Sequence, residues 1–227
     1  MGAAPVRGVT CRHLNRRDSV TKTLFLPDAS GSAAFWKPVA DRLSCNVRLF
    51  AWPGLGREPA QQGIDSFDDL ITMVKAEIDT PVAIVAQSMG GYIALQVALA
   101  LPAMVTRLVL VATSGGLPVQ HFGGQDWRQD YFGAFPMAAR WVAQPVEDLC
   151  ARLPQIPAPT LLLWGGADPI SPPAVGERLR GLLPAARLLI CRARVTIWRK
   201  RTPRQSPIRS GVTSTQRGEF RGSDKTP

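Results

Sequence analysis

PVAIVAQSMGGYIALQVALA, residues 81–100, joins a short β-branched run, one serine among small residues and a helical pattern. A serine at a sharp turn from a buried strand into a helix has its hydroxyl lifted clear of the sheet, and only small neighbours permit that turn. The N–H of Met89 is expected at the helix N-terminus, where unpaired donors and the helix dipole favour an oxyanion. The stretch therefore predicts half of an acyl-transfer site around Ser88. The small neighbours are Ala86, Gly90 and Gly91.

These residues resemble the nucleophile elbow of the α/β-hydrolase family, G-x-S-x-G, with Ala86 in place of the first glycine. The resemblance implies an α/β-hydrolase fold, in which helices flank a mostly parallel sheet and a small helical lid covers one end. It also implies Ser88 as the nucleophile and the N–H of Met89 as an oxyanion donor. An ordinary strand-turn-helix packing unit is the alternative interpretation of this stretch.

The rest of the pattern alternates strands with helices. Strands separated by helices of this length indicate βαβ units and a parallel sheet, with sites at the carboxyl ends of the strands. Ser66 is a predicted cap for one helix. Besides the elbow, strands are expected at 21–26, 47–52, 106–112, 160–164 and 186–191, and helices at 35–43, 64–78 and 173–183.

The loop after the first strand reads Pro27-Asp28-Ala29. In α/β-hydrolases this loop supplies the second oxyanion donor after a His-Gly pair, so the resemblance implies the N–H of Ala29 in that role. Pro27-Asp28 stands where the family has His-Gly. A carboxylate repels an oxyanion, and glycine permits backbone angles that aspartate resists. A plain strand-to-helix turn is the alternative.

A second family pattern follows the strand at 160–164. The residues Gly165-Gly166-Ala167-Asp168-Pro169 resemble the G-x-x-D-P loop that carries the acid of the catalytic triad. The resemblance implies that Asp168 orients an imidazole through its Nδ1 hydrogen. An aspartate before a proline is also a good turn former, which is the alternative interpretation.

The histidine of the triad is missing from its expected place. The family order is Ser, then Asp or Glu, then His, and no histidine follows Asp168. His13 and His121 both lie upstream of the acid. We interpret His121 as a solvated loop residue.

Beyond Cys191 the sequence becomes rich in Arg, Ser, Thr and Pro. Residues 191–198 can be written as G/C-rich codons. When the same bases are read in the frame that starts at the last base of codon 190, they give Leu-Pro-Gly-Ala-Gly-His-Asp-Leu, which resembles the family's segment after its last strand. The histidine comes from the codons of Val195 and Thr196. We therefore interpret residues 192–227 as a frameshifted C-terminus that lacks the catalytic histidine.

Residues 115–157 interrupt the alternation and are rich in aromatic side chains. They predict a small helical lid. A lid over an apolar acyl group would use such residues as a substrate pocket, although aromatic residues at near-helical spacing also serve as plain packing. The pocket candidates are Trp127, Tyr131 and Phe135.

Length and charge indicate one hydrolase domain at 18–191, between a basic arm at 1–17 and a basic, disordered tail at 192–227. The net charge is +10, but residues 192–227 hold 10 Lys or Arg and 2 Asp or Glu, a net +8, which leaves +2 for the remainder. The tail has no nucleic-acid module and little aromatic surface, so no nucleic-acid partner is predicted. No apolar run reaches the roughly 18 residues of a membrane span, and residues 1–17 lack the apolar core expected of a secretory signal.

We therefore expect a cytoplasmic protein that acts on a small, apolar acyl compound without a cofactor or metal. The four cysteines lie far apart, with no metal-type spacing. The predicted function is hydrolysis of a carboxylic ester or a related acyl substrate, impaired by the missing histidine. The alternative is a non-catalytic relative that binds a ligand. The sequence does not predict the oligomeric state.

Overall fold

The computed structural model describes residues 21–191. The predicted arm at 1–17, with His13, and the predicted tail at 192–227 lie outside the described residues. Residues 21–191 all fall within one compact unit of the chain. No helix in this range is long and apolar enough to cross a membrane.

A six-stranded parallel sheet forms the centre of the fold, as the alternating pattern predicts. Its spatial order is β2-β1-β3-β4-β5-β6, so the chain starts inside the sheet, moves to one edge and then crosses to the other. The elbow strand β3 therefore lies between β1 and β4. The strands are β1 (Lys22–Leu26), β2 (Val47–Leu49), β3 (Val82–Gln87), β4 (Val105–Val111), β5 (Thr160–Gly165) and β6 (Ala186–Cys191).

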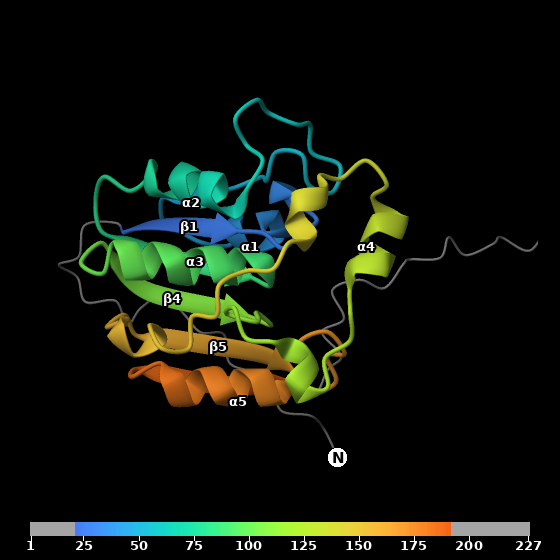
Figure 1. The fold of residues 1–227 in the computed structure, drawn as a ribbon. Coiled ribbons are helices and arrows are strands. Elements are labelled where there is room, and N and C mark those ends of the chain that lie inside the picture. Colours follow the sequence, from blue (N-terminus) through green and yellow to red (C-terminus); the bar gives the residue numbers. More distant parts are fainter. Residues whose placement is uncertain (1–20, 192–227) are drawn as a thin grey trace, which may run out of the picture. The chain divides into compact units, whose positions relative to one another are not determined.

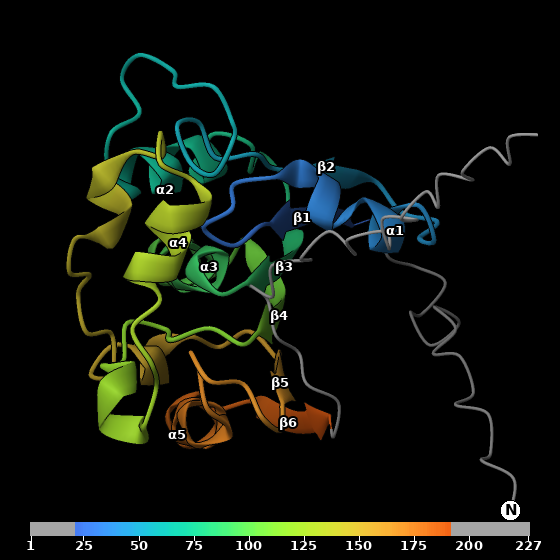
Figure 2. The same cartoon turned by 90° about the vertical axis from the view of Figure 1, so that its right-hand side faces the viewer.

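Helices lie on both faces of the sheet. The elbow helix α3 packs on β3 and β4, α5 packs on β5 and β6, and both cover the same face, whereas α1 lies on the other (Figures 1 and 2). The α-helices are α1 (Lys37–Ala40), α2 (Phe67–Lys75), α3 (Met89–Ala100), α4 (Arg128–Ala134) and α5 (Pro173–Leu182). The 3-10 helices are η2 (Ala33–Phe35), η3 (Val119–Phe122), η4 (Arg140–Ala143) and η5 (Leu153–Gln155).

Several elements are shorter than predicted. The helix expected at 35–43 is divided into η2 and α1. The strand expected at 47–52 ends at Leu49, because the N–H of Trp52 donates to the carbonyl of Gly31 in a loop. The predicted cap at Ser66 is confirmed: its hydroxyl accepts from the N–H of Asp69, so α2 begins at Phe67 rather than at residue 64.

The elbow helix is buried on nearly every side. It lies between the sheet and α2, and eight of its twelve residues are buried. A Cβ at Gly90 would come within 2.4 Å of the carbonyl oxygen of Pro27. Glycine at this position therefore lets the first turn of α3 pack directly against the end of β1.

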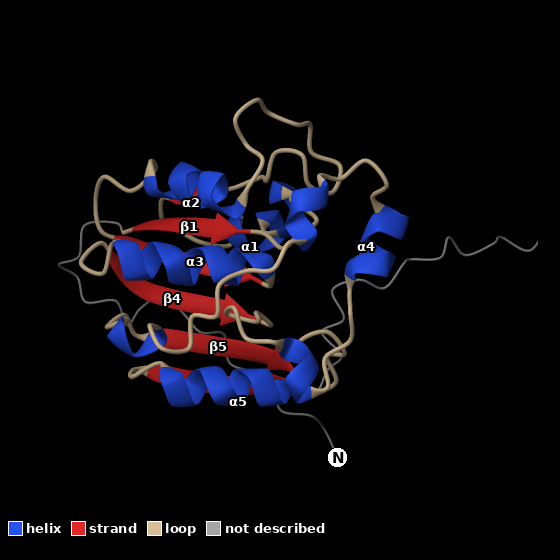
Figure 3. Cartoon of the chain, in the orientation of Figure 1, coloured by secondary structure: helices blue, strands red, loops and turns tan. Residues whose placement is uncertain are grey.

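The segment at 115–157, the predicted lid, holds the short helices η3, α4, η4 and η5 separated by loops (Figure 3). Its helix α4 lies beyond the carboxyl ends of the strands, on the side where the elbow and the predicted acid loop lie (Figures 1 and 2).

Candidate active site

The turn at Ser88 has the backbone of a strained elbow. Ser88 follows the last residue of β3 and has φ 49° and ψ −118°, a combination that non-glycine residues rarely adopt. Its N–H donates to the carbonyl of Val111 at 2.9 Å, and its own carbonyl accepts from the N–H of Gly91 at 2.9 Å. Such strain persists only where the surroundings determine the conformation, and it concentrates at functional sites.

The predicted oxyanion donors come from two loops. Met89 is the first residue of α3, so its N–H has no partner inside the helix. Ala29 is buried and follows β1, where the loop runs beside the elbow. Neither N–H donates a hydrogen bond to any other described residue.

Asp28 turns its carboxylate back onto its own loop. One oxygen accepts from both the N–H and the hydroxyl of Ser30, as in an Asx turn. The side chain is 2% exposed. Burial raises the pKa of Asp28, although the hydrogen bonds from Ser30 act in the opposite direction.

Tyr131 of α4 fastens the lid to the loop that carries Ala29. Its hydroxyl donates to the carbonyl of Ala29 at 2.8 Å and accepts from the N–H of Gly56 at 3.0 Å. The ring is 1% exposed and contacts Trp127 and Phe135, which are half-buried. Burial raises the pKa of the Tyr131 hydroxyl. Of the three predicted pocket residues, Tyr131 thus contacts the candidate oxyanion loop directly.

The carboxylate of Asp168 is bound through only one of its two oxygens. Its Oδ1 accepts from the N–H groups of Ile170 and Ser171, each at 2.9 Å. Its Oδ2 is buried and has no hydrogen-bond partner among residues 21–191. Burial raises the pKa of Asp168, against the two backbone hydrogen bonds. A buried polar atom without a partner is rare and points to a role in a site.

The elbow and the acid loop follow strands β3 and β5, which flank β4 in the sheet. His121 lies in η3 and is exposed. The chain after it contacts the acid loop, where the N–H of Gln125 donates to the carbonyl of Pro169 at 2.8 Å. Among the described residues, no group of three or more His, Cys, Asp or Glu is placed to hold a metal ion.

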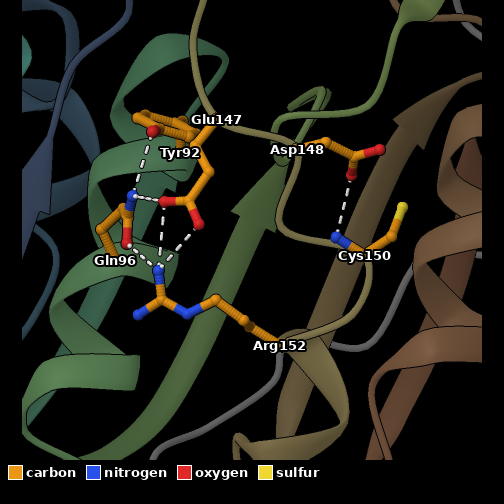
Figure 4. A network of polar contacts seen from close by, with 6 residues as sticks. All are labelled: Tyr92, Gln96, Glu147, Asp148, Cys150 and Arg152. Carbon is orange, nitrogen blue, oxygen red and sulfur yellow. Dashed lines mark hydrogen bonds and ion pairs between the residues drawn. The ribbon is translucent and has the colours of Figure 1, made fainter.

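A polar network ties the end of the lid to the elbow helix (Figure 4). Gln96 of α3 donates to the Tyr92 hydroxyl at 3.0 Å and to Glu147 at 3.1 Å. Arg152 donates to both carboxylate oxygens of Glu147 at 3.1 Å. Hydrogen bonds from Gln96 and then Arg152 lower the pKa of Glu147. The sequence gives no signal for this network, because no local pattern links residues so far apart.

The chain belongs to the alpha/beta hydrolase family, whose model matches residues 23–196. Among relatives of known assignment, it is 34% identical over 85 residues to a pimeloyl-[acyl-carrier protein] methyl ester esterase of Aliivibrio salmonicida (strain LFI1238). That match covers 37% of this chain and 32% of the relative, so the chain spans about a third of that protein's length.

A second esterase of the same description, from Neisseria meningitidis serogroup C, is 29% identical over 182 residues, covering 61% of this chain and 71% of the relative. A solved structure of a hydrolase from Pseudomonas aeruginosa PA01 superposes with a TM-score of 0.62 at 21% identity. The superposition covers 76% of this chain and 82% of the other, and it shows a shared fold.

Proposed function

We propose that this chain has the site of a serine hydrolase that acts on a carboxylic ester or a related acyl compound. Ser88 is the nucleophile, Asp168 is the orienting acid, and the N–H groups of Met89 and Ala29 are the oxyanion donors. The observation that carries the proposal is the strained Ser88 backbone at the start of α3. Relatives that are named methyl ester esterases support this substrate class.

In this reaction the Ser88 hydroxyl oxygen attacks the acyl carbon while its proton passes to a base. The acyl–oxygen bond of the ester breaks, and the leaving alcohol takes the proton from the base. Water then releases the acid by the same two steps, and the two N–H groups stabilise the oxyanion each time. The half-buried Trp127 and Phe135 are candidates to contact an apolar acyl group.

The general base has no counterpart at the family's expected place in the sequence. In the family a histidine donates its Nδ1 hydrogen to the acid, and the buried, unpartnered Oδ2 of Asp168 is suited to accept such a hydrogen. No histidine follows Asp168 in the sequence. We therefore propose that turnover is impaired, and that residues 192–227 stand in place of the segment that carries the histidine.

A non-catalytic ligand-binding protein is the second candidate, and the absence of a histidine after Asp168 favours it. A relic of this kind would keep the candidate pocket residues and the two oxyanion donors while it loses turnover. It is expected to bind an ester or a carboxylate without cleaving it.

Added imidazole separates the two candidates. We expect the full chain to hydrolyse p-nitrophenyl butyrate slowly, because loss of one triad member costs about a thousandfold to a millionfold in turnover. Imidazole supplies an N–H for Asp168 and a second nitrogen to accept the Ser88 proton. It should therefore accelerate hydrolysis, and labelling of Ser88 by a fluorophosphonate, in a saturable manner.

Ser88→Ala should abolish the imidazole-dependent rate, and Ser44→Ala, at an exposed serine in the loop before β2, is the matched control. A ligand-binding relic would bind the ester but show no Ser88-dependent rate at any imidazole concentration. Rapid hydrolysis without imidazole would show that the chain supplies its own base, and His121→Ala would then test the lid histidine.

A further inference from the structure

Two neighbouring strands end in strained turns. Among the described residues, the non-glycine residues with positive φ are Ser88, at 49°, and Ala112, at 44°. They follow Gln87 and Val111, which are paired at the ends of β3 and β4. The strain at Ser88 is explained by the elbow. The strain at Ala112 belongs to a turn with no assigned role.

The turn at Ala112 brings the side chain of Thr113 under the elbow. Thr113 is fully buried, and its Oγ1 donates to the carbonyl of Ser88 at 2.7 Å. The same oxygen accepts from the N–H of Gly115 at 3.2 Å, so the hydroxyl uses both its donor and an acceptor position. The carbonyl of Ser88 is thereby fixed by a side chain from the neighbouring strand end.

Close contact at this point depends on Gly91. A Cβ at this position would lie 2.5 Å from both Cβ and Oγ1 of Thr113, well inside contact distance. Because Gly91 is in the first turn of α3, Thr113 contacts the helix that presents Met89 as well as the turn that presents Ser88.

The main chain of Thr113 reaches the acid loop. Its carbonyl accepts from the hydroxyl of Ser171 at 3.3 Å. The N–H of Ser171 in turn donates to Oδ1 of Asp168 at 2.9 Å. One buried threonine is therefore linked to Ser88 through its side chain and to the Asp168 loop through its carbonyl.

We propose that Thr113 is a positioning residue that sets the placement of Ser88 relative to Asp168. This inference rests on the proposed function for its catalytic meaning, while the coupling of the two loops is independent of the chemistry. Loss of the hydroxyl removes the donor to the Ser88 carbonyl and leaves that carbonyl with fewer partners. A small displacement of a nucleophile lowers its reactivity strongly even when binding is retained.

The test compares three variants of the full chain. Thr113→Val keeps the size of the side chain but lacks the hydroxyl, and Thr113→Ser keeps the hydroxyl. Thr106→Val is the matched control, because Thr106 Oγ1 donates to the Val82 carbonyl at 2.8 Å and so joins the same two strands at their other ends.

With imidazole present, Thr113→Val should lower the fluorophosphonate labelling rate of Ser88 by about 10-fold to 100-fold. Thr113→Ser and Thr106→Val should retain most of the rate, and the KM for p-nitrophenyl butyrate should stay close to that of the parent. Equal labelling rates in Thr113→Val and Thr106→Val would overturn the positioning role.

Amide hydrogen exchange gives a second measurement that needs no catalysis. Thr113→Val should speed exchange both at residues 88–91 and at residues 168–171, whereas Thr106→Val should change neither. If the acid loop is unchanged in Thr113→Val, Thr113 does not couple the two loops. If the parent shows no Ser88 labelling at all, the proposed function fails, and the exchange result alone decides whether the coupling exists.

Discussion

Asp28 shows how one residue can depart from a family pattern at little conformational cost. Its φ is not positive, so the backbone here does not require the glycine that the family places in this loop. The carboxylate instead accepts hydrogen bonds from the N–H and the hydroxyl of Ser30 in the same turn. What remains is an electrostatic cost, since a buried carboxylate lies one residue before Ala29.

We expect Asp28→Asn to raise the free energy of unfolding at neutral pH. Burial raises the pKa of Asp28 above its ordinary value of 3.8, so the folded state holds this proton more tightly than the unfolded state. The resulting stabilisation is present below pH 3.8 and is lost as the pH rises through the raised pKa. Asparagine keeps an acceptor for Ser30 and does not ionise. Urea unfolding of Asp28→Asn and of the parent, from below pH 3.8 to neutral pH, measures the difference in their free energies of unfolding.

Asp79→Asn, at an exposed aspartate, is the control for that experiment. A variant at position 28 that is less stable than the parent at every pH would mean that the hydrogen bonds from Ser30 outweigh the cost of burial.

At the same scale, the sequence predicts site residues only where a local pattern carries them, and these assignments stay predictions. Ser88 was predicted from its small neighbours, and Asp168 from a glycine-rich turn before proline. Thr113 was missed, because a threonine after a strand has no distinctive pattern and its hydrogen bonds cross to residues far away in the chain.

At the scale of the elements, the lid is attached to the rest of the domain at two places, one by a buried hydrogen bond and the other by a partly exposed ion pair. Tyr131 of α4 is buried and bonds to the main chain of the Ala29 loop. Arg152 and Glu147, near its other end, form an ion pair with side chains that are 42% and 49% exposed. The spacing of the aromatic residues predicts a helical lid, but it does not predict which aromatic side chain forms hydrogen bonds with the rest of the domain.

We expect Tyr131→Phe to destabilise the protein more than Arg152→Met. The first change removes a partner from the buried N–H of Gly56 and the carbonyl of Ala29, which costs about 1–3 kcal/mol. The second removes an exposed ion pair, whose contribution is about 0–1 kcal/mol. Urea unfolding curves of both variants measure this. A larger loss for Arg152→Met would make the polar network in Figure 4 the main attachment of the lid.

Over the whole described sheet, the two faces are covered unequally. Along β3, β4 and β5, residues on the face toward α3 and α5 are buried, whereas those on the opposite face are half-buried or exposed except for Gln87 and Gly165 at the strand ends. Toward β6 the second face is more open, and Leu189 is 55% exposed. The alternation of strands and helices predicted a parallel sheet, but neither the order of its strands nor this asymmetry can be predicted from local periodicity.

We propose that the gene read in the alternative frame from codon 190 encodes a segment that covers this face of the sheet. Three chains test this: the full chain, residues 1–191, and the frame-corrected chain. Thermal unfolding should be similar for the first two and occur at a higher temperature for the third, because more apolar surface is buried. The frame-corrected chain should also hydrolyse p-nitrophenyl butyrate without added imidazole.

A large loss of thermal stability on removal of residues 192–227 would show that these residues pack on the domain, and would count against the frameshift interpretation. A well-folded, frame-corrected chain without esterase activity would mean that Asp28 impairs the oxyanion site or that the chemistry is not ester hydrolysis.

Strand β6 pairs with β5 on one side, and no other described strand pairs with it. Leu189 and Ile190 are exposed along it. A free strand edge with apolar side chains is a template for adding a strand from another molecule. Repulsion between copies with a net charge of +10 opposes such growth, but its range shortens to about 8 Å at physiological ionic strength. We therefore expect the colloidal stability of this protein to depend on ionic strength, with concentrated salt favouring self-association through β6.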